Sequence, residues 1–171
     1  MLYVYKSKLL AENIHDDKYY RKLDRLIFAS DFTVDADNDG VPDLWRISNS
    51  KDGLLEVYIG EAAKITNKGE GPSYLVTRQD FSLNPQTSYT INFFVGGDMP
   101  GEKIQFYVFS REGENTQHHW KDVQLSSQIS NISTSFVTTE DLVEGKQWLR
   151  IDIQGASEEP LNVKSIEIWE E

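Results

Sequence analysis

Short segments in which hydrophobic and polar residues alternate follow one another from Ile27 to the C-terminus. A period of two is typical of half-buried β-strands, and Gly, Pro, Asn and Asp bound these segments as they usually bound strands. The predicted strands are 54–59, 62–66, 73–81, 87–95, 103–110, 121–125, 133–138, 147–154 and 161–169. Their spacing of roughly ten residues leaves no room for crossover helices, so the pattern predicts an all-β fold, an antiparallel β-sandwich.

Residues 1–26 differ from the rest, because they carry charged helix formers and few β-branched side chains. The apolar residues that recur near their end at helical spacing are Tyr19, Leu23, Leu26 and Ile27. This spacing predicts a short amphipathic helix, and a partly ordered linker is an equal alternative. A helix of this length is marginal alone, so the segment could also join subunits into a homo-oligomer. We therefore divide the chain into an N-terminal extension, 1–26, and a β-sandwich, 27–171.

The formal net charge of -11 argues against nucleic acid or an anionic membrane surface as a partner, since both need a basic footprint. No run approaches the roughly 20 apolar residues of a membrane-spanning helix, so membrane insertion is not expected. The chain has no cysteine, which excludes disulfides and a thiol nucleophile. Its 3 histidines and the lack of a G-x-S-x-G motif favour a protein that is not an enzyme.

The strongest single motif is an acidic turn that reads D-x-D-x-D-G-x-x-D. Calcium takes about six to eight oxygen ligands, and alternate carboxylates on a tightly turning loop bring several of them to one point. The predicted calcium ligands are Asp35, Asp37, Asp39, the carbonyl of Val41, and Asp43. Arg46 stands where an EF-hand would place its closing glutamate, so a further ligand is expected from elsewhere, with Asp31 and Glu167 as candidates. The alternative is a solvated acidic turn without a metal.

Three stretches of the sequence resemble jelly-roll carbohydrate-binding modules. The segment FASDFTVDADNDGVPDLW resembles their opening, AAKITNKGEGPSYLVTRQDFSLNPQTSYTINFFVGG resembles their middle strands, and QWLRIDIQGASEEPLNVKSIEIWEE resembles their last two. The resemblance covers about residues 27–171 and implies a galactose-binding-like jelly roll that recognises a glycan. Many relatives carry an aspartate pair in the closing strand that ligates calcium, and this chain has Val163, Lys164 and Ser165 there.

A ligand face can be predicted from the polar side of three strands, 87–95, 103–110 and 147–154. Sugar binding combines aromatic rings, which pack on the C–H faces of a pyranose, with planar polar groups that satisfy its hydroxyls. If the three strands share a sheet, as the resemblance implies, one concave surface would hold the predicted ligand-binding residues Asn92, Gln105, Tyr107, Arg111, Trp148, Arg150 and Asp152. The alternative is that the N-terminal segment or a neighbouring subunit covers this face.

The run His118, His119 and Trp120 is expected in a loop, either at the edge of the glycan groove or with Trp120 folded inward. We expect a non-catalytic, calcium-stabilised module that binds a polysaccharide or cell-wall glycan. The second hypothesis is a structural or adhesion module of an oligomeric bacteriophage or bacterial surface appendage. The expected location is extracellular, on a cell surface or on a virion, although no apolar leader is visible between Met1 and Asp17.

Overall fold

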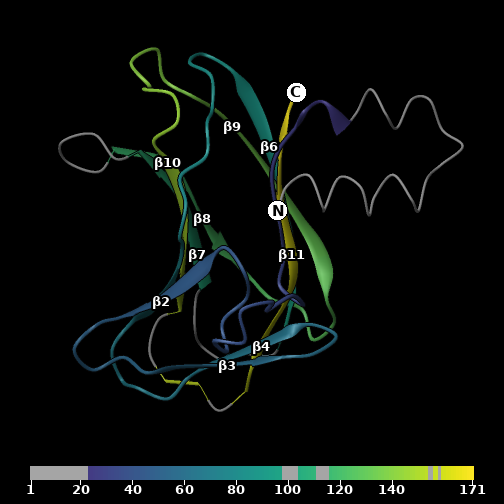
Figure 1. The fold of residues 1–171 in the computed structure, drawn as a ribbon, viewed down its shortest axis with the longest axis vertical. Coiled ribbons are helices and arrows are strands. Elements are labelled where there is room, and N and C mark those ends of the chain that lie inside the picture. The colour runs from purple at the N-terminus through teal and green to yellow at the C-terminus, as the bar shows by residue number, and fades with distance from the viewer. Residues whose placement is uncertain (1–22, 98–103, 111–115, 154–155, 158) are drawn as a thin grey trace, which may run out of the picture.

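The computed structural model describes residues 23–97, 104–110, 116–153, 156–157 and 159–171, with only the backbone of Thr116, His118 and Trp120. These residues form 11 β-strands in two antiparallel sheets that face each other across a hydrophobic core (Figure 1). The predicted antiparallel β-sandwich is therefore confirmed. No helix among the described residues is long and apolar enough to cross a membrane.

One sheet has six strands, and its central strand is unusually long. Its members are β1 (Leu26–Asp31), β3 (Leu55–Ile59), β4 (Ala63–Asn67), β6 (Ser88–Gly96), β9 (Ser130–Val137) and β11 (Leu161–Glu170), and the order in space is β3-β4-β11-β6-β9. Strand β6 pairs with β11 from Asn162 to Glu170 and so occupies one edge of β11. On the other edge, β11 first pairs with β4 and then with β1.

The other sheet has five strands in the order β2-β5-β10-β7-β8. They are β2 (Trp45–Asn49), β5 (Ser73–Thr77), β7 (Ile104–Ser110), β8 (Thr116–Val123) and β10 (Gln147–Ile153). Strand β10 is central and pairs with β5 and β7. The chain crosses from the six-stranded to the five-stranded sheet through the acidic turn, which joins β1 to β2.

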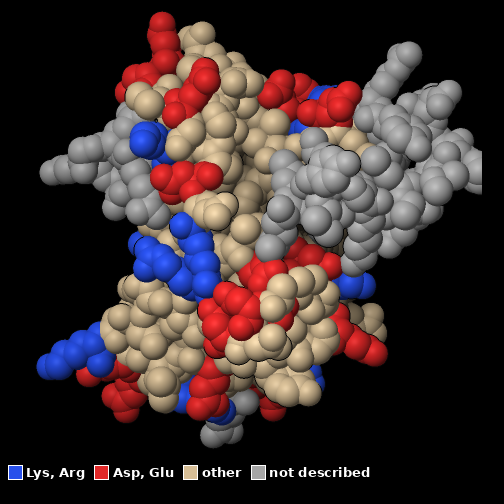
Figure 2. All heavy atoms as spheres, viewed as in Figure 1, with Lys and Arg blue, Asp and Glu red and all other residues tan. Residues whose placement is uncertain are grey.

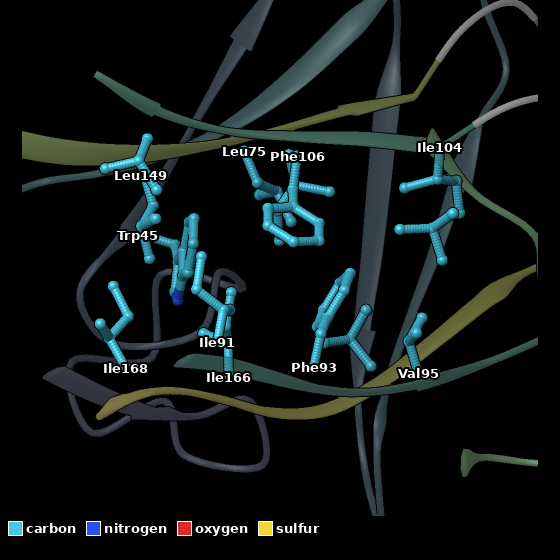
Figure 3. Close-up of a cluster of buried hydrophobic side chains, with 14 of the residues drawn as sticks. Trp45, Leu75, Ile91, Phe93, Val95, Ile104, Phe106, Leu149, Ile166 and Ile168 are labelled. Carbon is cyan, nitrogen blue, oxygen red and sulfur yellow. The ribbon is translucent and has the colours of Figure 1, made fainter. Parts of the chain in front are cut away.

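The core lies between the sheets and is built from alternate residues of each strand, as predicted. Along β6 the buried residues are Tyr89, Ile91, Phe93 and Val95, all 0% exposed. Phe93 meets Phe106 of the facing sheet edge-on, with ring centres 5.7 Å apart (Figure 3). Trp45 is also fully buried, and its Nε1 donates a 2.7 Å hydrogen bond to the Ser30 hydroxyl, which ties β2 to β1.

The strand bounds differ from the prediction mainly at the start of the sandwich. Strands β1 and β2 are missing from the predicted set, and β8 and β9 begin at Thr116 and Ser130 rather than at 121 and 133. The predicted helix does not reach Leu26 and Ile27, because both lie in β1, whose pairing with β11 overrides the local spacing. Most of that predicted helix falls outside the described residues.

Candidate functional site

The acidic turn between β1 and β2 is held together by its own carboxylates. Asp35 accepts backbone hydrogen bonds from Asp39 at 3.2 Å and from Gly40 at 3.0 Å, and Asp43 accepts one from Ala36 at 3.0 Å. Gly40 has a φ of 81°, in the left-handed region that favours glycine, so the sharp turn depends on this residue.

Three carboxylates of the turn converge on one point. The ligand oxygens of Asp35, Asp37 and Asp39 all lie within 4.8 Å of one another. The guanidinium of Arg78 approaches this cluster, 3.4 Å from an oxygen of Asp37 and in hydrogen-bond contact with Asp39, and it also donates to the Trp45 carbonyl. Figure 2 shows a group of acidic side chains near the middle of the viewed face, next to a group of basic ones.

Arg78 supplies positive charge to this turn. Its hydrogen bond to Asp39, followed by that of the Val41 N–H, lowers the pKa of Asp39, and the same pairing raises the pKa of Arg78. A set of carboxylate oxygens that attracts a guanidinium also has the hard-oxygen chemistry of a calcium site. The residues present therefore fit a calcium ion held by Asp35, Asp37 and Asp39.

The other carboxylates considered for calcium have different partners. Asp31 accepts hydrogen bonds from the N–H of Thr33 at 2.9 Å and from its hydroxyl at 2.6 Å. Glu167 is almost buried and accepts a 2.8 Å hydrogen bond from the indole N–H of Trp169. Among the described residues, the converging group contains neither of them.

A second cluster lies on the outer face of the five-stranded sheet, and we call it the aromatic face. It consists of Tyr74, Tyr107, Phe109, Trp148, Arg150 and Asp152. The ring of Phe109 stacks between Tyr107 and Trp148, with centre distances of 5.3 and 4.7 Å and interplanar angles of 17° and 19°. Alternate residues of β5, β7 and β10 bring these rings together, because their intervening residues fill the core.

Arg150 lies at the centre of the aromatic face. Its guanidinium carbon is 4.7 Å from the ring centre of Tyr107, 4.9 Å from that of Tyr74 and 5.0 Å from that of Phe109. Its Nε and Nη2 contact the two carboxylate oxygens of Asp152 at 2.6 and 2.9 Å. The cation–π contacts, the hydrogen bond from Nη2 and the charge contact of Nε fix the orientation of the guanidinium plane.

A polar chain borders the arginine. The hydroxyl of Tyr107 donates to Gln105 at 2.8 Å, and the Gln105 amide donates to Asp122 of β8 at 2.6 Å. Burial, and after it the charge of Asp152, raises the pKa of Tyr107, so this phenol stays a neutral hydrogen-bonding group. Burial also raises the pKa of Asp152, while Arg150 opposes that shift.

No family model matches the sequence, and no curated protein matches it. Solved structures do. One titled "CBM4 structure and function" is 14% identical with a TM-score of 0.59, and the match covers 78% of this chain and 99% of that one. The module pair of Clostridium thermocellum endo-1,4-beta-D-xylanase 10B, complexed with xylohexaose, is 14% identical with a TM-score of 0.59, and the match covers 86% of this chain and 28% of that one. This chain has a jelly-roll fold of the carbohydrate-binding-module type.

A similar fold occurs in part of a bacteriophage tailspike protein. The enzymatically active domain of bacteriophage CBA120 tailspike protein 4 is 3% identical with a TM-score of 0.55, and the match covers 75% of this chain and 20% of that one. At identities this low the likeness establishes the fold alone, because one fold can carry many different functions.

The jelly roll brings together most of the predicted ligand-binding residues, with one correction. Gln105, Tyr107, Trp148, Arg150 and Asp152 share the outer face of the five-stranded sheet. Asn92 does not, because β6 belongs to the six-stranded sheet, where Asn92 lines a small hollow with Arg25 and Trp169. The expectation that all three strands share one sheet is therefore wrong. Arg111 lies outside the described residues.

Burial separates the predicted residues of the aromatic face by role. Trp148 is only 8% exposed and Asp152 only 2%, so the first supports the stacked rings and the second anchors Arg150. Tyr74 is a further residue of this face that was not predicted; it is partly exposed and faces Arg150 from β5. Alternation within β5 could have found it, since Leu75 is a core residue and its neighbours must face outward.

The histidine run lies in a strand rather than in a loop, which corrects that expectation. All three residues belong to β8, where Trp120 is opposite Tyr107 and His119 is opposite Val108 of β7, and His118 falls at an irregularity in the pairing. His119 points between the sheets, where its ring stacks on Phe136 at 5.1 Å and lies 5.9 Å from Phe106. Burial, and after it the charge of Lys121, lowers the pKa of His119. This histidine is thus part of the packing between the two layers.

Proposed function

We propose that this protein is a non-catalytic module that binds a polysaccharide or glycan on its aromatic face. The observation that carries the proposal is Arg150, held in one plane by Asp152 and flanked by the rings of Tyr74 and Tyr107. The jelly-roll fold supports it, since several structures with this fold are titled as carbohydrate-binding modules in complex with xylohexaose, cellotriose or beta-1,4-galactotriose.

The chemistry suits a neutral pyranose. The partly exposed rings of Tyr74 and Tyr107 offer apolar surface to the C–H face of a sugar. The remaining N–H groups of Arg150 and the amide of Gln105 provide donors and acceptors for hydroxyls. Because Asp152 is buried and committed to Arg150, its carboxylate suits positioning rather than proton transfer, which agrees with a non-catalytic role.

Calorimetric titration with neutral xylo-, cello- and β-1,4-galacto-oligosaccharides tests this proposal. We expect one of them to bind, and Tyr107→Ala and Tyr74→Ala each to weaken that binding roughly tenfold through loss of ring contact. Val137→Ala, which truncates a 62% exposed apolar side chain on the other sheet, is the control and should bind normally. Melting curves confirm that each variant is folded. Unchanged affinity in both aromatic-face variants, or no binding across the series, would refute the proposal.

We also propose that the acidic turn takes up calcium. Bound calcium would supply positive charge to Asp35, Asp37 and Asp39, with the Val41 carbonyl and Asp43 as further ligands. Arg78 would then leave its present contacts with the turn. Because the turn joins β1 to β2, the ion would stabilise the connection between the two sheets.

Calcium titration followed by both calorimetry and thermal melting tests this site. A ligand present at 100 times its dissociation constant stabilises a fold by about 2.7 kcal/mol, so a chelator should lower the melting temperature measurably. Asp37→Asn should weaken binding, whereas Arg78→Gln should strengthen it by removing the competing cation. Neither heat of binding nor any change with chelator would count against calcium.

The structural or adhesion role in a surface or virion appendage is a second proposal, supported by the fold shared with the tailspike domain. An extracellular, cell-surface or virion location goes with either role. Light scattering on the full chain and on a chain lacking residues 1–22, which leaves β1 intact, tests the appendage role. A homo-oligomer that dissociates on truncation would favour it, and a monomer in both cases would exclude assembly through this segment.

A further inference from the structure

A groove of about 820 Å³ lies on the outer face of the six-stranded sheet, on the opposite side of the molecule from the aromatic face. The residues that line it include Tyr58, Lys64, Phe94, Ile129, Asn162 and Lys164. None of them belongs to the aromatic face, so the groove is a separate site.

Strand register forms the floor of this groove. Tyr58 of β3 is opposite Lys64 of β4, Lys64 is opposite Asn162 of β11, and Asn162 is opposite Gly96 of β6. Directly opposed residues project from the same face of a sheet, so one row across four strands presents a ring, a cation and an amide. Lys164 follows at an irregularity in the pairing of β11 with β6.

Gly96, at the end of this row, allows the backbone of Gln128 and Ile129 to pack directly against β6 and form one side of the groove. A Cβ atom there would come within 2.6 Å of the backbone of Gln128 and Ile129, closer than real atoms approach. The chain that enters β9 therefore lies directly against β6 at Gly96. Ile129, which is 41% exposed, and Phe94 then line one side of the groove, while Tyr58 lines the other.

The charge of the groove is opposite to that of the protein. Lys64 and Lys164 are both exposed, and among the described residues neither forms an ion pair. Glu61 is the carboxylate among the lining residues, so two cations outnumber one anion in a chain whose net charge is -11. Charges further away are screened beyond about 8 Å at physiological ionic strength, so these local lysines dominate the electrostatics of a ligand in the groove.

From this arrangement we propose that the groove is a second glycan site that takes an acidic sugar, a pyranose bearing a carboxylate or a sulfate. The two lysines pair with the anionic group, Asn162 hydrogen-bonds to hydroxyls, and the exposed ring of Tyr58 packs on the C–H face. This proposal goes beyond neutral-glycan binding at the aromatic face and uses none of the residues of that face.

Calorimetric titration of the full chain with three oligosaccharides of equal length tests the groove. The probes are an oligogalacturonate, a sulfated heparin fragment and a neutral β-1,4-galacto-oligosaccharide. We expect at least one acidic probe to bind in a way that Tyr107→Ala leaves unchanged. The oligogalacturonate and heparin arms show whether carboxylate or sulfate is the preferred anionic group. Raising the salt concentration should weaken this binding, because the lysine contacts are exposed and screened.

Charge-neutral variants locate the binding. Lys64→Gln and Lys164→Gln should each weaken the acidic probe roughly two- to fivefold, and the double variant about tenfold. Lys68→Gln removes an exposed lysine just beyond β4 that does not line the groove, so it should have no effect. The proposal is overturned if neither acidic probe binds to the folded protein, or if binding survives the double variant. A loss of neutral-glycan binding alone would refute only the aromatic face.

Discussion

The two outer faces of the sandwich hold their cations in opposite ways. On the five-stranded sheet, Arg150 is enclosed by three rings and paired with Asp152, whose side chain is 3% exposed. On the six-stranded sheet, Lys64 and Lys164 project into a groove without an ion-pair partner among the described residues. The first face is preorganised, and the pair of Arg150 and Asp152 is expected to matter both for its stability and for the proposed glycan binding. The second face is open, and its charges are available to a ligand.

This difference bears on the ligands that each face suits. A preorganised ring and guanidinium surface binds without ordering many side chains, which favours weakly interacting neutral sugars. Two flexible exposed lysines lose side-chain entropy on binding. Their ligand must offset this cost by electrostatic attraction, which favours an anionic ligand. Substitutions of these cations test the comparison directly: replacing Arg150 should lower the free energy of unfolding, whereas replacing Lys64 and Lys164 should not.

The largest effect is expected on breaking the ion pair of the aromatic face. Arg150→Met leaves the buried Asp152 carboxylate without its cation, and breaking such a pair costs about 3 to 5 kcal/mol. Since 28% of the Arg150 side chain is exposed, we expect the lower end of that range. The free energy of unfolding from urea denaturation measures it.

A double variant is the control for this prediction. Arg150→Met combined with Asp152→Leu replaces both charges by apolar groups of similar size, which is often neutral or stabilising for buried pairs. It should recover most of the lost stability without recovering glycan binding. If the single variant were as stable as the wild type, the aromatic face would not be preorganised by this pair.

Much of the fold follows from local patterns in the sequence. The alternation in β6, β7 and β10 assigns core residues such as Phe93, Phe106 and Ile151 correctly, because a period of two depends only on neighbours in the chain. Trp45 is likewise found in the core beneath the acidic turn.

The candidate sites depend on distant pairings that alternation does not encode. Asn92 was assigned to the wrong surface. Alternation along β6 shows that Asn92 lies on the polar side of its strand, but it does not show which strands pair with β6. Arg78 lies 39 residues from Asp39 in sequence, so the motif of the acidic turn does not predict their contact. Lys64 and Asn162 likewise become neighbours only through the pairing of β4 with β11.

A smaller effect on the free energy of unfolding is expected at His119, between the two sheets. His119 packs against Phe106 of one sheet and Phe136 of the other, and burial lowers its pKa. The unfolded chain, with an ordinary histidine pKa near 6.5, therefore binds a proton more readily than the folded one. Stability should be fully present above that pH and should fall as the pH drops toward the lowered pKa, by about 1.4 kcal/mol per unit of difference.

The variant His119→Phe keeps the ring packing and removes the titration. Its free energy of unfolding, measured between pH 7 and pH 5, should decline less than that of the wild type. Because His119 contacts both sheets, its protonation in the wild type should destabilise both sheets together rather than one of them. Identical pH profiles for the two proteins would show that His119 protonation does not couple the layers.

The smallest effect on stability is expected in the lysine groove. Replacing an exposed residue usually changes the free energy of unfolding by less than about 0.5 kcal/mol, and Lys64 and Lys164 are both exposed. The double variant Lys64→Gln, Lys164→Gln should therefore unfold at the same urea concentration as the wild type, or slightly above it if the two charges repel across the groove. A loss of more than about 1 kcal/mol would mean that these lysines stabilise the fold through contacts with other parts of the chain. The groove would then resemble the aromatic face, where the pair of Arg150 and Asp152 is expected to contribute to stability as well as to the proposed glycan binding.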